Sequence, residues 1–301
     1  MKTGDEYEEK CLLGRGAFGR VVKVVRKSDG KIFALKAMSE KSETMANDEA
    51  AILNHLKRVE GTVTLVAKFK HRKEHCLLME FCGWGDLETL IRIRGRLTEP
   101  EVRLICKQLV ETLASIHKAK IIHLDLKPAN IFIGEGMKLK VGDFGIAAKI
   151  EVKTWGVCGT PGFIAPEVLA DKKHTTKADV WSLGMIALVL LTGKMPCHVK
   201  FHPSQYDSTR LSPEASDFIV KSMHRQPAIR KTAQELKSHP FLTQGQCPGS
   251  LGLKVFFLPP QGHLVMAAPL PKRPLSLTTN KKTHKKAKAL HGTTESHDAT
   301  P

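Results

Sequence analysis

The amino-acid sequence predicts an α+β fold in two lobes, a small lobe rich in strands followed by a larger, mainly helical lobe. Short runs rich in Val and aromatic residues, separated by turns that contain Gly, fill residues 7–81 and predict strands. Among them, residues 42–59 have apolar side chains at helical spacing. From Asp86 onward the apolar pattern is mostly helical, and strands followed by helices are typical of the α+β class.

The expected elements follow in order along the chain. Thr98-Glu-Pro-Glu101 predicts the start of a helix, because Thr can cap it and Pro fits its first turn. An apolar stripe then runs to Ile116, and a second apolar helix from about Thr175 to Leu191 must be buried on nearly all sides. The strands of the small lobe are predicted at residues 7–13, 20–26, 31–38, 62–69 and 75–81.

The composition is that of a globular protein with a sizeable core, since 42% of the 301 residues are hydrophobic and 26% are charged. No apolar run approaches the roughly 18–20 residues that a membrane span needs, and the polar N-terminus lacks the apolar core of a signal peptide. Seven scattered cysteines without a CxxC pair argue against a disulfide framework or a zinc site. We therefore expect a cytoplasmic or nuclear protein that is not secreted and has no membrane partner.

A glycine-rich segment near the N-terminus has the pattern GxGxxGxV. The pattern alone is weak, because dinucleotide-binding folds share it, but those folds place a helix directly after the glycines. Here a predicted strand follows, so the glycines lie at a hairpin tip where backbone N–H groups could approach phosphate oxygens. A plain β-hairpin without a ligand is the alternative. The candidate phosphate-binding residues are Leu13, Gly14, Arg15, Gly16, Ala17, Phe18, Gly19, Arg20 and Val21.

Lys36 ends the apolar run Phe33-Ala-Leu-Lys on the next predicted strand, where its ammonium could reach phosphates under the loop. A lysine among apolar neighbours needs a partner, because a buried unpaired charge is unfavourable. Glu49 is the expected partner, and Glu43 is the second choice. The alternative is that these residues are solvated surface charges.

The motifs His123-Leu-Asp-Leu-Lys-Pro-Ala-Asn130 and Asp143-Phe-Gly145 decide between these interpretations. With them, residues 7–242 resemble the eukaryotic protein kinase family, whose signatures include a glycine-rich loop, a strand lysine and these two motifs. The match also includes Ala165-Pro-Glu167, Asp179-Val-Trp-Ser-Leu-Gly184 and Arg230. The resemblance implies a bilobal kinase domain with ATP between an N-lobe at about 7–82 and a C-lobe at about 83–242. Residues 1–6 would be an N-terminal extension.

The resemblance also implies roles for the polar residues of these motifs. Asp125 would orient the hydroxyl of a protein substrate, and Lys127 and Lys36 would steady the phosphates. Asn130 and Asp143 offer the oxygen ligands that Mg²⁺ prefers. Lys127 and Thr160 are similar to the serine/threonine subclass, so we expect transfer of the γ-phosphate of Mg-ATP to Ser and Thr hydroxyls of protein substrates.

The same resemblance implies a site for the adenosine part of ATP. Met79 would be the gatekeeper, and Glu80-Phe-Cys82 the hinge. Val21, Ala34 and Phe132 would sandwich the adenine ring, with ordinary core packing as a second role. Asp86 would reach the ribose or a basic substrate side chain. Glu167 and Arg230 would form a structural ion pair in the large lobe.

Two residues depart from the family pattern. Leu124 stands where the family usually has an Arg that contacts a phosphate on the activation loop. Gly156 stands four residues before Thr160, where similar loops carry a phosphorylatable Thr. We therefore expect activity that does not depend on phosphorylation of this loop. A pseudokinase or binding scaffold is the alternative, although Lys36, Asp125 and Asp143 are all present.

The C-terminal tail, residues 243–301, lacks any periodic segment and is expected to be disordered. It carries eight Lys or Arg against Glu295 and Asp298, so it contributes +6 to the chain's net charge of +17. Lys281–Lys288 predicts nuclear import or nucleic-acid contact, or only a solubilising charge run. Lys272–Leu277 resembles a short docking peptide for another protein. A nucleic-acid-binding protein is the third interpretation of the whole chain, and it depends on charge alone.

Overall fold

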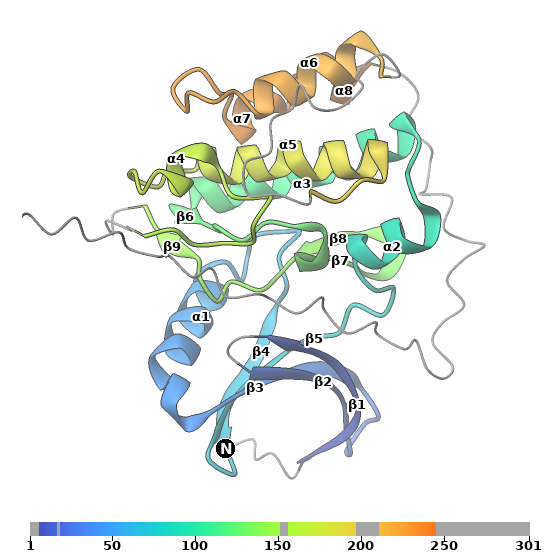
Figure 1. The fold of residues 1–301 in the computed structure, drawn as a ribbon. Coiled ribbons are helices and arrows are strands. Elements are labelled where there is room, and N and C mark those ends of the chain that lie inside the picture. The colour runs from blue at the N-terminus through green and yellow to red at the C-terminus, as the bar shows by residue number, and fades with distance from the viewer. Residues whose placement is uncertain (1–5, 17–18, 151–155, 197–210, 245–301) are drawn as a thin grey trace, which may run out of the picture. The chain divides into compact units, whose positions relative to one another are not determined.

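The computed structural model describes residues 6–16, 19–150, 156–196 and 211–244. The chain divides into two units, residues 1–264 and 265–301, and the second lies outside the described residues. The first unit begins with a five-stranded antiparallel sheet and one helix and continues with mainly helical structure (Figure 1). The predicted bilobal α+β fold is therefore confirmed.

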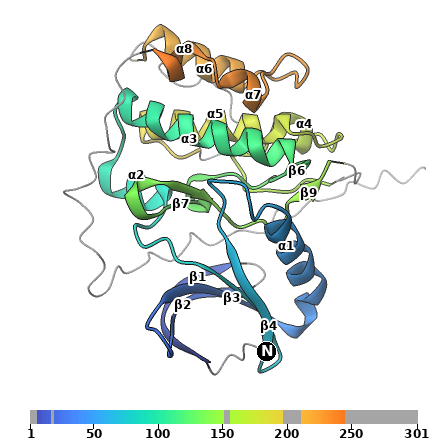
Figure 2. The ribbon, with the colours of Figure 1, turned by 180° about the vertical axis from the view of Figure 1, so that it is seen from behind.

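The strand order in the N-lobe sheet is β1-β2-β3-β5-β4, so β1 and β4 are its edge strands. Helix α1 packs against β4 and β5 (Figures 1 and 2). One face of the sheet and α1 bury apolar side chains in the main core of the molecule, while the other face has a smaller core of its own. The elements are β1 (Tyr7–Gly16), β2 (Gly19–Arg26), β3 (Ile32–Met38), η2 (Glu40–Ser42), α1 (Glu43–His55), β4 (Leu65–His71) and β5 (Glu74–Glu80).

The segment between α1 and β4 differs from the prediction. The helix ends at His55 instead of continuing to residue 59, and β4 begins at Leu65 instead of residue 62. Thr62 explains the difference, because its hydroxyl donates a hydrogen bond of 2.9 Å to the Val59 carbonyl and so closes a turn after the helix. Its backbone also forms a bridge with Val141, which links the two lobes.

The C-lobe is built around two long helices, α3 (Glu99–Lys118) and α5 (Lys177–Thr192). The predicted start of α3 is confirmed, since the Thr98 backbone N–H donates to the Glu101 carboxylate over 2.8 Å. Helix α5 buries all but its two end residues, as its mainly apolar sequence predicted. The other helices are α2 (Leu87–Arg94), η3 (Pro128–Asn130), η4 (Glu135–Met137), α4 (Pro166–Leu169), α6 (Pro213–Ser222), α7 (Ala233–Leu236) and α8 (Pro240–Thr243).

Four short strands between the lobes were missed by the sequence analysis. They form two antiparallel pairs, β6 with β9 and β7 with β8. Segments of two or three residues are too short to show a two-residue period, which is why the pattern did not reveal them. The four strands are β6 (Ile121–Ile122), β7 (Ile131–Ile133), β8 (Leu139–Val141) and β9 (Ala148–Lys149).

None of the described helices is both long enough and apolar enough to cross a lipid bilayer.

Candidate active site

Lys36 connects three elements at the junction of the two lobes. From β3, its ammonium donates to both carboxylate oxygens of Glu49 on α1, at 2.8 and 2.7 Å, and to Asp143 Oδ1 at 2.9 Å. Burial acts to lower the pKa of Lys36, but the charges of Asp143 and Glu49 outweigh it, and the pKa is raised. The lysine therefore stays charged. Glu49, rather than the second choice Glu43, is its helical partner.

Asp143 lies two residues after the end of β8 in a left-handed backbone conformation, with φ of 56°. This conformation is uncommon for a residue with a Cβ and is typical of strained functional positions. Although burial acts in the opposite direction, the ammonium of Lys36 lowers the pKa of the Asp143 carboxyl. Its side chain remains 45% exposed, so the carboxylate is ionised and accessible.

The loop between β6 and η3 holds Asp125 in a small polar network. Its Oδ2 accepts from the Lys127 ammonium at 2.9 Å, and its Oδ1 accepts from the Thr160 hydroxyl at 2.6 Å. Lys127 also donates to the Thr160 hydroxyl at 2.7 Å, which closes a triangle of contacts. Asn130 donates to the Asp125 backbone carbonyl at 2.8 Å. The network fixes the carboxylate of Asp125 before any ligand arrives.

Asp179, near the start of α5, binds the backbone of this loop through its carboxylate. Its carboxylate is fully buried and accepts the backbone N–H groups of His123 and Leu124, each at 2.9 Å. It also accepts from His117 Nε2 at 2.9 Å. Burial acts to raise the pKa of Asp179, but its hydrogen bonds, first that from His117, lower it. Leu124 has φ of 67°, so the carboxylate holds a strained turn just before Asp125.

The segment that carries Thr160 is packed tightly onto the same loop. A Cβ atom on Gly159 would lie 2.6 Å from the Leu124 carbonyl oxygen, so only glycine fits there. The side chain of Leu124 is buried in the apolar core. At Gly156 the backbone N–H donates to Asp171 at 2.6 Å.

Asn130 and Asp143 are the residues that could hold a metal ion. The Asn130 amide nitrogen is engaged with Asp125, which leaves Oδ1 as an oxygen ligand, and Asp143 has Oδ2 beyond its contact with Lys36. One amide and one carboxylate suit Mg²⁺, which takes few protein oxygens and completes its shell with water and phosphate. The described residues contain no cluster of three or more His, Cys, Asp or Glu side chains that could hold a metal by themselves.

Three of the predicted adenosine residues lie on one face of the N-lobe sheet. Register pairs Val21 with Lys36 and Ala34 with Met79, so these side chains lie on the face that carries the lysine. Phe132, on β7, packs against the main core and remains partly exposed. Val21, Ala34 and Met79 thus form an apolar surface beside the Lys36 ammonium, of the kind that an adenine ring requires.

The glycine-rich segment forms the predicted hairpin, with Gly16 opposite Gly19. Gly19 is required by close packing, because a Cβ there would clash with the Ala37 carbonyl oxygen. The Arg20 side chain forms ion pairs with Glu74 at 2.5 Å and with Glu9 at 3.0 Å. Only the backbone of Arg20 can therefore bind a phosphate. Leu13, Gly14 and Arg15 continue β1 toward the tip, whereas Ala17 and Phe18 lie outside the described residues.

The predicted hinge residues lie at a surface cavity of about 470 Å³, between the end of β5 and the β7–β8 turn. Glu80 is held by the Lys140 ammonium at 3.0 Å and by the Thr64 backbone N–H at 2.7 Å. Burial raises the pKa of Cys82 to about 12, so its thiol is neutral.

Asp86 caps α2 by accepting the Thr89 backbone N–H at 2.7 Å. Its carboxylate is therefore partly engaged already.

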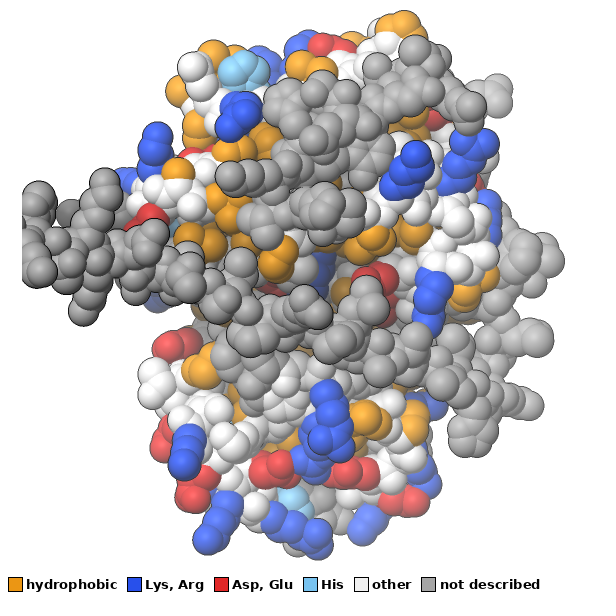
Figure 3. Space-filling view, viewed as in Figure 1, with side chains coloured by type: hydrophobic (Ala, Val, Ile, Leu, Met, Phe, Trp, Pro, Cys, Tyr) orange, Lys and Arg blue, Asp and Glu red, His pale blue; other side chains and the backbone are white. Residues whose placement is uncertain are grey.

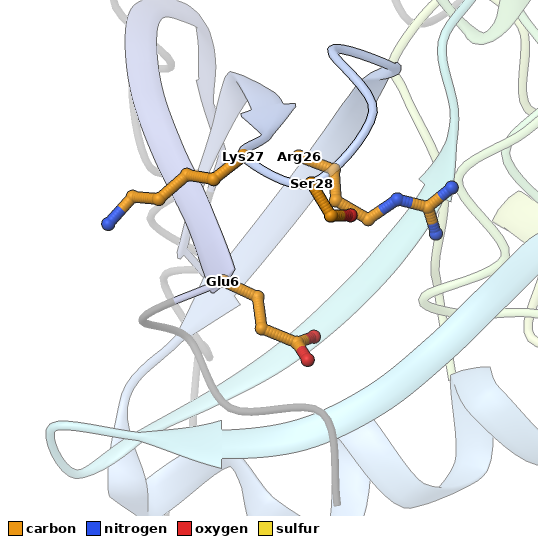
Figure 4. A pocket seen from close by; sticks show the side chains of 4 residues that line it. All are labelled: Glu6, Arg26, Lys27 and Ser28. Atoms are coloured by element: carbon orange, nitrogen blue, oxygen red, sulfur yellow. The ribbon is translucent and has the colours of Figure 1, made fainter.

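A second cavity, of about 450 Å³, is lined by Glu6, Arg26, Lys27 and Ser28 (Figure 4). It lies at the end of the β1–β2 hairpin opposite the glycines, because Tyr7 pairs with Arg26 whereas Gly16 pairs with Gly19. Arg26 is engaged by Asp29 at 2.5 Å. This cavity shares no residue with the candidate site.

Sequence reasoning missed two contributors to the site. Thr160 was used only as a sign of subclass, although its hydroxyl contacts both Asp125 and Lys127. Asp179 was used only as part of a motif, although it holds the backbone of the loop. An acidic residue at the start of an otherwise apolar helix is the signal that could have revealed Asp179, because a buried carboxylate needs several donors.

The fold and these contacts define a class of protein that comparison with known families identifies. Residues 7–242 match the family model described as the protein kinase domain. The chain belongs to the protein kinase family.

Its relatives are serine/threonine-protein kinases. The chain is 33% identical to the inactive serine/threonine-protein kinase PLK5 of Mus musculus, over 87% of this chain and 48% of the relative. It is 30% identical to the serine/threonine-protein kinase PLK2 of Mus musculus, over 87% and 41%. It is 31% identical to the probable serine/threonine-protein kinase CCRP1 of Zea mays, over 89% and 48%. The chain thus spans about half, or less, of the length of these relatives.

Proposed function

We propose that residues 7–242 catalyse the transfer of the γ-phosphate of Mg-ATP to Ser and Thr hydroxyls of protein substrates. The observation that supports this proposal best is the triangle of Asp125, Lys127 and Thr160. It holds the side chains of an aspartate, a lysine and a threonine in mutual contact. Lys36 and Asp143 extend the same charge pattern across the two lobes.

In this proposal each residue has a separate task. Asp125 accepts a hydrogen bond from the incoming hydroxyl and takes its proton as the oxygen bonds to the γ-phosphorus. The bond from that phosphorus to the β–γ bridging oxygen breaks, and ADP leaves. Such proton transfer contributes about 10²–10⁴-fold to a rate. Lys127 places positive charge beside the transferred group, and Lys36 holds the phosphates that remain on the nucleotide. Val21, Ala34 and Phe132 contact the adenine ring. The other hinge and loop residues named above are proposed to contact the nucleotide through their backbones.

Magnesium, held by Asn130 and Asp143, would neutralise charge on the phosphate oxygens. Asp143 suits this task because its pKa is lowered and half of its side chain is open. Asn130 suits it because its amide nitrogen is already fixed by Asp125, which orients the amide oxygen.

The proposed activity does not depend on phosphorylation of the segment before Thr160. Leu124 is apolar and buried, so it provides no cation for a phosphate. Gly156 has no hydroxyl, and its N–H is held by the carboxylate of Asp171 instead. Gly159 also packs closely against the Leu124 carbonyl, and this contact holds the residue before Thr160 in place without a phosphate group.

Label transfer from radioactive ATP to casein tests the activity. We expect label on Ser and Thr with the wild-type chain and a loss of at least about 100-fold with Asp125→Asn. Prior phosphatase treatment should leave the wild-type rate unchanged. A large loss that Thr154→Ala reproduces would contradict phosphorylation independence; Thr154 lies outside the described residues.

A non-catalytic scaffold is the second candidate, because one relative carries the word inactive in its name. Titration calorimetry with Mg-ATP separates the two. Binding of nucleotide without any label transfer, with the wild type and Asp125→Asn behaving alike, would favour the scaffold.

The remaining sequence predictions concern segments outside the described residues. The docking peptide at Lys272–Leu277 and the basic cluster at Lys281–Lys288 remain proposals for a partner protein and for nuclear import or nucleic-acid contact. Fusion of residues 270–291 to a fluorescent protein tests import, and an even spread of fluorescence through the cell would contradict it.

A further inference from the structure

The β4–β5 hairpin presents an unusual concentration of positive charge. Its sequence from Lys68 to Lys73 is Lys-Phe-Lys-His-Arg-Lys, and the residues that the argument uses, Lys68, Lys70, Arg72 and Lys73, are here called the hairpin cations. All four side chains are exposed. Lys70 is paired with Glu40 at 2.9 Å, and Lys68 contacts the neutral amide of Asn47. Among the described residues, Arg72 and Lys73 form no ion pair.

The two residues at the tip of this hairpin have an unfavourable backbone conformation. His71 pairs with Glu74, so Arg72 and Lys73 form a two-residue loop, and both have positive φ, 45° and 65°. A two-residue hairpin loop with two positive φ values is a type I′ turn, which strongly prefers Asn-Gly. Side chains with a Cβ are strained there. Backbone strain that persists at an exposed turn suggests that the side chains of Arg72 and Lys73 have a function, such as binding a partner.

The strand that leads to the tip is open along one edge. β4 is the last strand of the sheet and pairs only with β5 among the described residues. Its outer backbone groups can therefore pair with an added strand, a common mode of peptide recognition. Lys68 and Lys70 project from the same face of β4, with one residue between them, and an extended peptide presents its own side chains with the same period.

Charge identifies the occupant as an acidic segment. The chain's own tail is excluded on this ground, because eight basic residues against Glu295 and Asp298 give it +6. Nucleic acid is disfavoured because carboxylates lie among the cations: Glu40 pairs with Lys70, and Glu74 follows the tip. Figure 3 shows this mixture of Lys and Arg with Asp and Glu over the strand-rich lobe. A polyphosphate carries a charge at every unit and would place some of them beside these carboxylates, whereas a peptide with carboxylates at alternate residues can place them opposite the cations.

We propose that the hairpin cations and the open edge of β4 dock an extended acidic segment of another protein. Arg72 and Lys73 contact its carboxylates at the tip, and its backbone pairs with β4. The surface is separate from the catalytic residues, since none of the hairpin cations belongs to the candidate site.

The test uses the full chain and a fluorescein-labelled peptide that alternates Glu and Thr. The variant R72N/K73G installs the preferred turn and removes two charges. We expect its Tm to rise by about 2–6 °C, and its affinity for the peptide to fall about three- to tenfold at low salt. The control K172S/K173S removes two exposed lysines from the C-lobe and should reduce affinity less than about twofold.

Two further probes separate this proposal from its rivals. A peptide with Pro in place of Thr has the same charge but cannot pair with a strand edge, and it should bind more weakly. Equal losses of affinity in the two variants would overturn the proposal, as would an unchanged Tm in R72N/K73G. Tighter binding of a thymidine oligonucleotide of equal charge, weakened by the same variant, would assign the surface to nucleic acid instead.

Discussion

Replacement of Asp179 by Asn should destabilise the whole C-lobe, although it changes one atom of the side chain. The carboxylate is fully buried and accepts three hydrogen bonds, each of 2.9 Å, from His123, Leu124 and His117. An amide has one acceptor oxygen and turns an NH₂ group toward at least one of these donors. The loss is one charge-assisted bond, about 1.5–3 kcal/mol, and one buried unsatisfied donor, about 1–3 kcal/mol.

We therefore expect Asp179→Asn to lower the free energy of unfolding by about 3–5 kcal/mol, out of a total of about 5–15 kcal/mol. Urea unfolding followed by far-ultraviolet circular dichroism measures it, and a slope of about 2–3 kcal/mol per molar predicts a midpoint shift of about 1–2 M. Asp217→Asn is the matched control. Its side chain is 43% exposed and its loss should be below about 1 kcal/mol. Equal midpoints for the two variants would refute this account of the loop.

Three further predictions use other contacts. Glu49→Gln removes the charge of one of the two carboxylates that bind the Lys36 ammonium, and we expect label transfer to fall about 10–100-fold with little change in Tm. Arg230→Lys cannot reproduce the paired bonds to Glu167, at 2.7 and 3.0 Å, and should cost about 2–4 kcal/mol in urea unfolding. Burial lowers the pKa of His239, so the folded state binds its proton less readily than the unfolded state and stability should fall as the pH drops below about 6.5. His239→Asn should flatten this dependence between about pH 7.5 and 5.5; an unchanged slope would contradict it.

The sequence predicted the parts of the fold that depend on local pattern. The capping signal of Thr98 and Glu101 and the mainly apolar sequence of α5 placed two helices within two residues of their observed starts. The pair Lys36 and Glu49 followed from the need of a buried charge for a partner. These inferences needed only neighbours in sequence or general electrostatics.

Other features depend on contacts between distant segments and could not be predicted in the same way. The end of α1 is decided by Thr62, whose bridge partner, Val141, lies far along the chain. The task of Asp179 depends on backbone groups at 123 and 124. The strain at Arg72 and Lys73 became visible only with the register of β4 on β5. Sequence pattern does not encode such contacts, because each one joins residues that no local period relates.

The bonds of Lys36 have a mechanical consequence. The Lys36 ammonium connects α1, through Glu49, to Asp143 in the large lobe, and neither hydrogen bond is longer than a typical N–H···O bond. A ligand or partner that tilted α1 outward would thus pull the lysine away from Asp143 or leave Glu49 alone. Such a tilt would be transmitted to Asp143 without any covalent modification of the chain. Through this contact a bound partner could lower the proposed activity without any phosphorylation of the chain.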